Sequence, residues 1–206
     1  MTTTGLTIVH TGDGKGKTTA ALGLALRAWG DGLRVLIMQF IKSSQATGEA
    51  RAIAALTKLQ TQSATSEADT ATTSSASQQP NKPGRIELIT GGCGFTQRNL
   101  TAVQLAQHRA AARNTLAQAV TALKSGAWDM LVLDEINYAV KFGLLDIAEV
   151  LALLDLREQL APRMHLVLTG REAAPELVAR AELVTEMRLV KHPYQQGIKA
   201  QRGIEY

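Results

Sequence analysis

The feature that most constrains the fold of this chain is a glycine-rich turn between a predicted strand and a predicted helix. The β-prone run covers residues 6–10, and an Ala- and Leu-rich run with helical periodicity covers residues 18–29. Between them stands the sequence Gly12-Asp13-Gly14-Lys15-Gly16-Lys17-Thr18-Thr19. It matches the later part of the P-loop pattern, although Thr11 stands where that pattern has its first glycine. The strand before it and the helix after it favour a phosphate site over a glycine-rich hairpin with a chance Lys-Thr pair.

The P-loop pattern assigns a role to each part of this segment. Its glycines let backbone N–H groups turn toward a triphosphate, and the N-terminus of the following helix faces the same anion. Lys17 would bridge phosphate oxygens, and Thr18 would offer its hydroxyl to Mg²⁺. We therefore predict that residues Gly12 to Thr19 bind the triphosphate of ATP.

A pair of acids follows a second apolar run. Residues 129–133 are predicted to form a strand, and Asp134 and Glu135 come directly after it. A P-loop fold places the carboxylates that hold Mg²⁺, directly or through water, at such a strand end. An acidic pair in this position is also typical of a solvated strand end or a helix cap, but the P-loop upstream favours metal binding. The spacing does not decide which acid contacts the ion.

The remaining pattern alternates strands with helices. Further strands are predicted at residues 33–39, 85–89, 165–169 and 183–189, and further helices at 49–59, 101–126, 146–160 and from 175 onward. Thr101 with Gln104, and Asp146 with Glu149, form the capping boxes of two of these helices. Such alternation predicts an α/β fold with a mostly parallel sheet, helices on both faces and ligands at the carboxyl ends of the strands.

One stretch departs from this alternation. Residues 61–83 are rich in Ser, Thr, Gln, Ala and Asn and contain two prolines, which is too polar a composition to bury a core. We predict a disordered polar insertion there, within a single domain that spans residues 1–206.

Composition and charge exclude several classes of partner. Aromatic residues make up 4% of the chain, and its net charge of +4 comes from scattered Lys and Arg rather than from a basic run. Both features argue against nucleic-acid binding and against a basic membrane patch. A single cysteine, Cys93, rules out an intramolecular disulfide, and no apolar run is long enough for a spanning helix. We expect a cytoplasmic protein.

Two more residues are candidates for the site. Phe95 lies in a glycine-rich turn after a strand, where its ring could face a flat ligand or plug the core. Arg171 follows the strand at 165–169 and could pair with phosphate at the same sheet edge, although an exposed surface role is equally compatible with the sequence. Cys93 is more typical of a packed residue than of a reactive one.

Several blocks of the sequence together resemble the P-loop corrinoid adenosyltransferases, also called cob(I)yrinic acid a,c-diamide adenosyltransferases. These blocks are HTGDGKGKTTAALGLALRAWG, QFIKS, GFT, LVLDEINY, LTGR and VKHPYQQGIKAQRGIEY, and they occur in order along nearly the whole chain. The GKGKTTAA segment with Thr11 before it and the closing KAQ-x-GI-[DE]-Y are unusual outside this family.

The resemblance implies a RecA-like P-loop fold, a homodimer and the transfer of the 5′-deoxyadenosyl group of ATP to Co(I) of a reduced corrinoid with release of triphosphate. Thr18 and Glu135 would bind Mg²⁺ or Mn²⁺, with Asp134 as the supporting acid. Phe95 would lie over the corrinoid and help to remove its lower axial ligand, and an electron-donating flavoprotein would supply Co(I). Gln97 stands where better-known members have a second aromatic residue, and the insertion at 61–83 is not part of the usual family pattern.

The P-loop does not itself reveal which bond of ATP breaks. An ordinary ATPase or kinase and a non-catalytic nucleotide sensor share the motif, and so does a RecA-like nucleic-acid motor, which the composition favours least. The assignment to adenosyl transfer rests on the resemblance.

Overall fold

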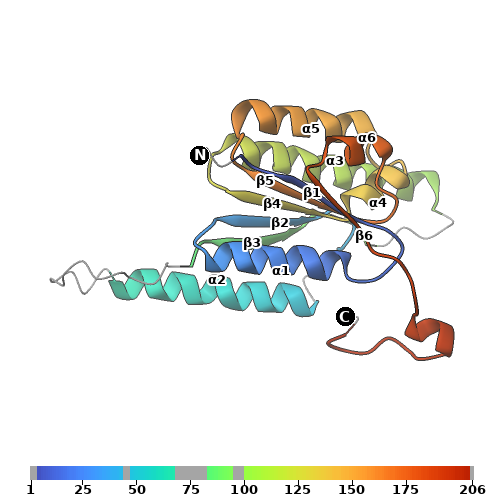
Figure 1. Ribbon diagram of the computed structural model, residues 1–206, viewed down its shortest axis with the longest axis horizontal. Helices are drawn as coiled ribbons and strands as arrows, with labels where there is room; N and C mark the ends of the chain where they lie inside the picture. Colours follow the sequence, from blue (N-terminus) through green and yellow to red (C-terminus); the bar gives the residue numbers. More distant parts are fainter. Residues whose placement is uncertain (1–3, 44–46, 68–82, 95–99, 205–206) are drawn as a thin grey trace.

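The computed structural model of the 206-residue chain describes residues 4–43, 47–67, 83–94 and 100–204 (Figure 1). The strands are β1 (Thr7–Thr11), β2 (Val35–Gln39), β3 (Ile86–Thr90), β4 (Met130–Asp134), β5 (His165–Thr169) and β6 (Leu183–Glu186). The α-helices are α1 (Lys17–Gly30), α2 (Gly48–Glu67), α3 (Ala102–Lys124), α4 (Ile136–Lys141), α5 (Ile147–Leu160) and α6 (Pro175–Arg180). A short 3-10 helix, η1 (Pro193–Gln196), follows near the C-terminus.

The strands form one six-stranded sheet in the order β3-β2-β4-β5-β1-β6, and every neighbouring pair is parallel. Strand β5 therefore lies between β1, which leads into the P-loop, and β4, which ends at the acidic pair. In the observed register Thr169 pairs with His10, and Asp134 pairs with Gln39. The carboxyl ends of four strands consequently meet around the P-loop. This arrangement confirms the predicted α/β fold with a parallel sheet and is consistent with a RecA-like P-loop fold.

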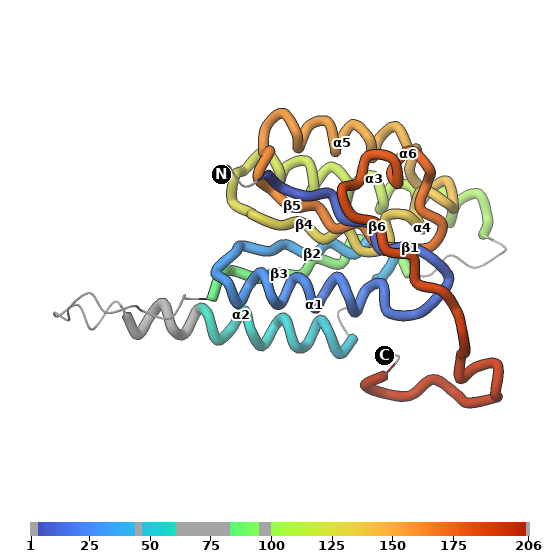
Figure 2. Tube along the Cα trace, in the orientation of Figure 1, coloured from blue at the N-terminus to red at the C-terminus, as the bar shows by residue number. Residues whose placement is uncertain are grey.

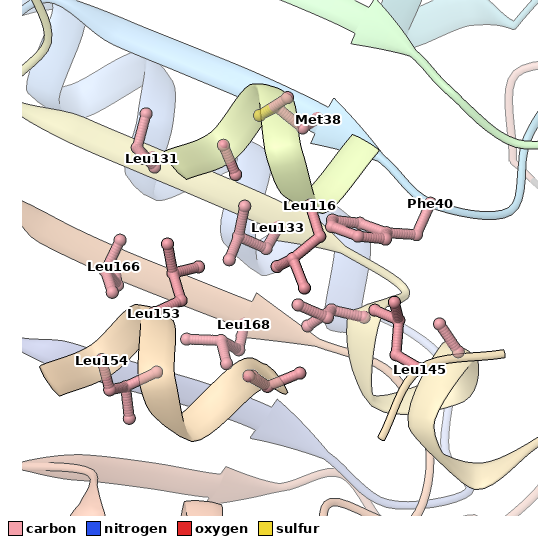
Figure 3. Close-up of a cluster of buried hydrophobic side chains, with 14 of the residues drawn as sticks. Met38, Phe40, Leu116, Leu131, Leu133, Leu145, Leu153, Leu154, Leu166 and Leu168 are labelled. Carbon is pink, nitrogen blue, oxygen red and sulfur yellow. The ribbon is translucent and has the colours of Figure 1, made fainter. Parts of the chain in front are cut away.

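Helices cover both faces of the sheet, as predicted (Figure 1). The face covered by α3, α4, α5 and α6 buries a cluster that includes Phe40, Leu116, Leu133 and Leu153, whose side chains pack together in Figure 3. The face covered by α1 and α2 buries a second, smaller cluster. Successive strand residues point to opposite faces, and a strand buried on both sides is therefore apolar throughout.

Both predicted capping boxes are present. The Thr101 side chain accepts a hydrogen bond from the Gln104 backbone N–H at the start of α3, and the Gln104 side-chain oxygen accepts one from the Thr101 backbone N–H. Asp146 and Glu149 make the equivalent pair at the start of α5. Each box satisfies N–H groups that have no acceptor within the helix, and it therefore stabilises a helix start at that position. The two boxes thus located the starts of α3 and α5 correctly.

The structure differs from the sequence predictions in three places. Helix α2 continues to Glu67, past residue 61 where we placed the start of the polar insertion; residues 61–67 contain no glycine or proline, the two residues that most disfavour a helix. Residues 68–82 of that insertion lie outside the described residues. The six-residue helix α4 was not predicted at all, and β6 ends at Glu186 instead of residue 189.

After β6 the chain leaves the sheet and continues as a largely exposed C-terminal segment, residues 187–204 (Figure 2). Among the described residues, no helix combines the length and the apolar character needed to span a membrane.

Candidate functional site

Glycine forms the turn between β1 and α1 because the backbone there adopts left-handed conformations. Gly12 has φ 92°, and Gly16, the N-cap of α1, has φ 106°. These values are costly for residues with a Cβ atom and readily adopted by glycine. The turn directs the N-terminus of α1, whose first N–H groups have no acceptor within the helix, toward the carboxyl edge of the sheet, as a phosphate site requires.

Lys17 is held inside this turn. Its side chain is buried, and its Nζ donates hydrogen bonds to the carbonyl oxygens of Gly12 at 2.7 Å and Gly14 at 2.6 Å. Burial lowers the pKa of Lys17, and the positive charge of Arg171 lowers it further. Its ammonium group thus lies where an anion bound by the turn would meet it.

The other end of the P-loop connects to the acidic pair. Thr18 Oγ1 donates a hydrogen bond to Asp134 Oδ1 at 2.8 Å, and Asp134 is 1% exposed. The second oxygen of the same carboxylate, Oδ2, accepts a hydrogen bond from Gln39 Nε2 at 3.1 Å and lies 3.9 Å from Lys42 Nζ. Asp134 is therefore held in one orientation beside the Thr18 hydroxyl.

Glu135 differs sharply from its neighbour. Its backbone is left-handed, with φ 64° and ψ 22°, a conformation that costs a non-glycine residue about 1–2 kcal/mol. Its Oε2 atom is buried without a hydrogen-bond partner among the described residues. Burial raises the pKa of Glu135, and the negative charge of Asp134 adds to the increase, while Lys17, the next contributor, opposes it.

These residues can together bind a nucleotide with a divalent cation. The turn and Lys17 provide positive groups for phosphates, while Thr18, Asp134 and Glu135 provide oxygen atoms of the kind that Mg²⁺ prefers. No cluster of three or more His, Cys, Asp and Glu residues suited to a metal occurs in the described ranges. A cation here would therefore complete its coordination with phosphate oxygens and water, as Mg²⁺ commonly does at nucleotide sites.

The structure brings most of the predicted residues to one place. Arg171 is exposed just after β5 and is close enough to influence the pKa of Lys17, as is Asp13. Thr19 lines a largely apolar cavity of about 350 Å³ between α1 and α2. Phe95 lies outside the described residues, so its predicted position over a flat ligand stays a prediction.

Sequence reasoning missed four contributors to this site. Thr169 hydrogen-bonds to both acids of the pair, and Gln39 and Lys42 approach Asp134 from β2 and the loop after it. The backbone oxygen of Met187, just after β6, accepts a hydrogen bond from Gly14 N–H at 2.6 Å. A signal for two of them was present, because Gln39 and Thr169 are polar residues that directly follow the apolar runs of their strands.

Comparison with known proteins agrees with this geometry. Residues 3–206 match the family model described as ATP:corrinoid adenosyltransferase BtuR/CobO/CobP. The chain is 35% identical to a corrinoid adenosyltransferase of Sinorhizobium sp over 202 residues, which is 98% of this chain and 80% of the relative. It is 34% identical to that of Pseudomonas aeruginosa, with 98% and 84% covered, and 32% identical to that of Escherichia coli K12, with 98% and 86% covered.

Proposed function

This chain belongs to the ATP:corrinoid adenosyltransferase family, and from that premise we propose how its P-loop site carries out the reaction. The observation that supports the proposal is the convergence of Lys17, Thr18, Asp134 and Glu135 at the carboxyl edge of the sheet. The P-loop holds the triphosphate of ATP while the 5′-deoxyadenosyl group passes to the cobalt of a corrinoid. The reduced corrinoid is the second substrate.

The bond changes in this reaction require little proton transfer. The electron pair of Co(I) forms a bond to C5′ of the ribose, the C5′–O bond breaks, and the whole triphosphate leaves with that bond's electrons, so the cobalt becomes Co(III). Because Co(I) is itself a strong nucleophile, the protein needs no general base. Its contribution is to position the two substrates and to stabilise the negative charge that builds on the leaving triphosphate.

Lys17 and the N-terminus of α1 provide this stabilisation. Two carbonyl oxygens hold the buried Lys17 ammonium at the turn, and its third N–H group is left to donate to a phosphate oxygen. Arg171 lies close enough to interact electrostatically with Lys17, and we assign it to the same triphosphate.

The oxygen atoms of Thr18, Glu135 and Asp134 fit a divalent cation. We propose that Thr18 and Glu135 bind Mg²⁺, which Mn²⁺ could replace, and that Asp134 supports it by accepting the Thr18 hydrogen bond. The unpaired buried oxygen of Glu135 supports this assignment, because a buried acceptor without a partner is costly unless a ligand satisfies it. When bound, Mg²⁺ neutralises charge on the phosphate oxygens.

For the corrinoid side we propose Phe95 as the residue that lies over the corrin ring, on the basis of the GFT block. We further propose a homodimer and a transient flavoprotein that reduces the cobalt. Both assignments come from the family resemblance.

An ATP analogue separates this reaction from γ-phosphoryl transfer. The β,γ-imido analogue of ATP keeps the C5′–O bond and the leaving triphosphate chain but resists attack at the γ-phosphorus. We expect the protein to adenosylate chemically reduced cob(I)alamin with this analogue under anaerobic conditions, as it does with ATP, and the Lys17→Ala variant to show neither reaction. If the protein consumes ATP but not the analogue, adenosyl transfer is refuted and an ATPase or kinase activity is indicated.

A further inference from the structure

Thr169 connects the two acids of the site. Its hydroxyl donates a hydrogen bond to Asp134 Oδ1 at 2.8 Å and accepts one from the Glu135 backbone N–H at 2.9 Å. Within the described part of the chain, no other side chain hydrogen-bonds to both residues. Thr169 is fully buried, so water does not compete for either bond.

The order of the strands explains this position. Strand β5 lies between β1 and β4, so the last residue of β5 faces the P-loop strand on one side and the acidic strand on the other. Asp134 Oδ1 accepts hydrogen bonds from Thr18 on the P-loop helix and from Thr169 on β5. The same carboxylate oxygen is thus shared by the P-loop and by β5.

The bond to the Glu135 backbone has a separate effect. Glu135 adopts a left-handed conformation that a non-glycine residue avoids unless its surroundings fix it, and its N–H is held by Thr169. Loss of this bond would remove one restraint on the left-handed backbone and therefore on the position of the Glu135 carboxylate.

We propose that Thr169 is the positioning residue that sets the geometry of the cation site, by holding Asp134 against Thr18 and Glu135 in its left-handed conformation. The inference rests on the proposed function, because it assumes that the acidic pair and Thr18 bind Mg²⁺ with ATP. Thr169 acts through the two acids.

The test compares Mg²⁺-dependent ATP binding in three variants, by calorimetry without any corrinoid. Thr169→Val keeps the shape and removes the hydroxyl, and Thr169→Ser keeps the hydroxyl and removes the methyl group. Thr7→Val is the matched control. Thr7 is also a buried strand threonine, and its hydroxyl accepts a hydrogen bond from Arg157. It begins β1, however, and so lies at the edge of the sheet opposite to the P-loop. Thermal unfolding is recorded for each variant, to report any general loss of stability.

We expect Thr169→Val to raise the Mg²⁺ concentration for half-maximal ATP binding by about tenfold or more, as loss of a residue that orients metal ligands commonly does. Binding in EDTA should stay at the wild-type level, and Thr169→Ser should restore the wild-type Mg²⁺ dependence. A purely structural role predicts that Thr169→Val and Thr7→Val both unfold at lower temperature and both keep the wild-type Mg²⁺ dependence, which would overturn the proposal. If the wild-type protein binds no ATP at any Mg²⁺ concentration, the proposed function fails as well, so the two failures are distinguishable.

Discussion

Replacing Glu135 with glutamine should make the protein more stable and less active. The glutamate is mostly buried, has one oxygen without a partner and stands next to Asp134, and these surroundings raise its pKa. Glutamine has nearly the same shape and no charge, so it removes the negative charge that burial and the neighbouring Asp134 disfavour. Glutamine leaves a polar atom in the same position, so the gain comes from removing the buried negative charge beside Asp134. We expect a gain of about 1 kcal/mol at neutral pH, the size that single stabilising substitutions commonly give. For a chain of this size, 1 kcal/mol corresponds to a rise in Tm of roughly 2–4 °C.

The stability that Glu135→Gln gains over the wild-type protein should increase as the pH rises. Because folding raises the pKa of this carboxyl, the folded state holds its proton more tightly than the unfolded state. The wild-type protein therefore has the full stability from this group below the pKa of the unfolded state and loses it as pH rises through the raised pKa of the folded state. The Tm difference between Glu135→Gln and wild type should be close to zero in acid and reach its full value at neutral pH.

Differential scanning calorimetry from pH 4.5 to 8 measures this difference, with Glu176→Gln as the control. Glu176 is an exposed acid in the first turn of α6, and its replacement should not reproduce the pH-dependent gain. With MgATP present the wild-type protein should have the higher Tm of the two, because it binds the ligand more tightly and is stabilised more by it. A Glu135→Gln protein that is less stable than wild type at neutral pH, or a difference that is the same at every pH, would refute this reasoning.

Three other predictions concern the P-loop and the corrinoid side. Lys17→Ala should weaken ATP binding by more than about 100-fold in calorimetry, since hydrogen bonds to charged groups contribute about 1.5–3 kcal/mol each; wild-type affinity in this variant would contradict the site assignment. Gly14→Ala should also lose ATP binding, because its new Cβ would lie 2.7 Å from the backbone oxygen of Met187, whereas Gly23→Ala, with nothing within 4 Å of the new atom, should bind normally. Phe95→Ala should retain ATP affinity but slow adenosylation that starts from a Co(II) corrinoid, and equal rates in the two proteins would remove Phe95 from the proposed mechanism.

The parts of the site that are local in sequence could be predicted. The P-loop, the acidic pair and the two capping boxes are short patterns that can be recognised from residue type and spacing, and the structure has each pattern at its predicted place. Alternation of strands and helices was likewise sufficient to predict a parallel sheet with two helical layers.

The parts that depend on the order of the strands could not be predicted. Alternation does not reveal that β5 inserts between β1 and β4, so the sequence does not specify that Thr169 contacts Asp134, which lies 35 positions earlier in the chain. The contact between Gly14 and Met187 depends in the same way on β6 pairing with β1. The left-handed backbone of Glu135 has no sequence signal either, because such positions usually carry glycine or asparagine.

Product identification tests the central claim most directly. Purified protein is incubated anaerobically with MgATP and chemically reduced cob(I)alamin, and both products are identified by mass spectrometry. Our account predicts light-sensitive adenosylcobalamin together with intact triphosphate in equal amounts. ADP and phosphate with no adenosylated corrinoid would contradict it, because the P-loop would then act on the γ-phosphate and not on C5′.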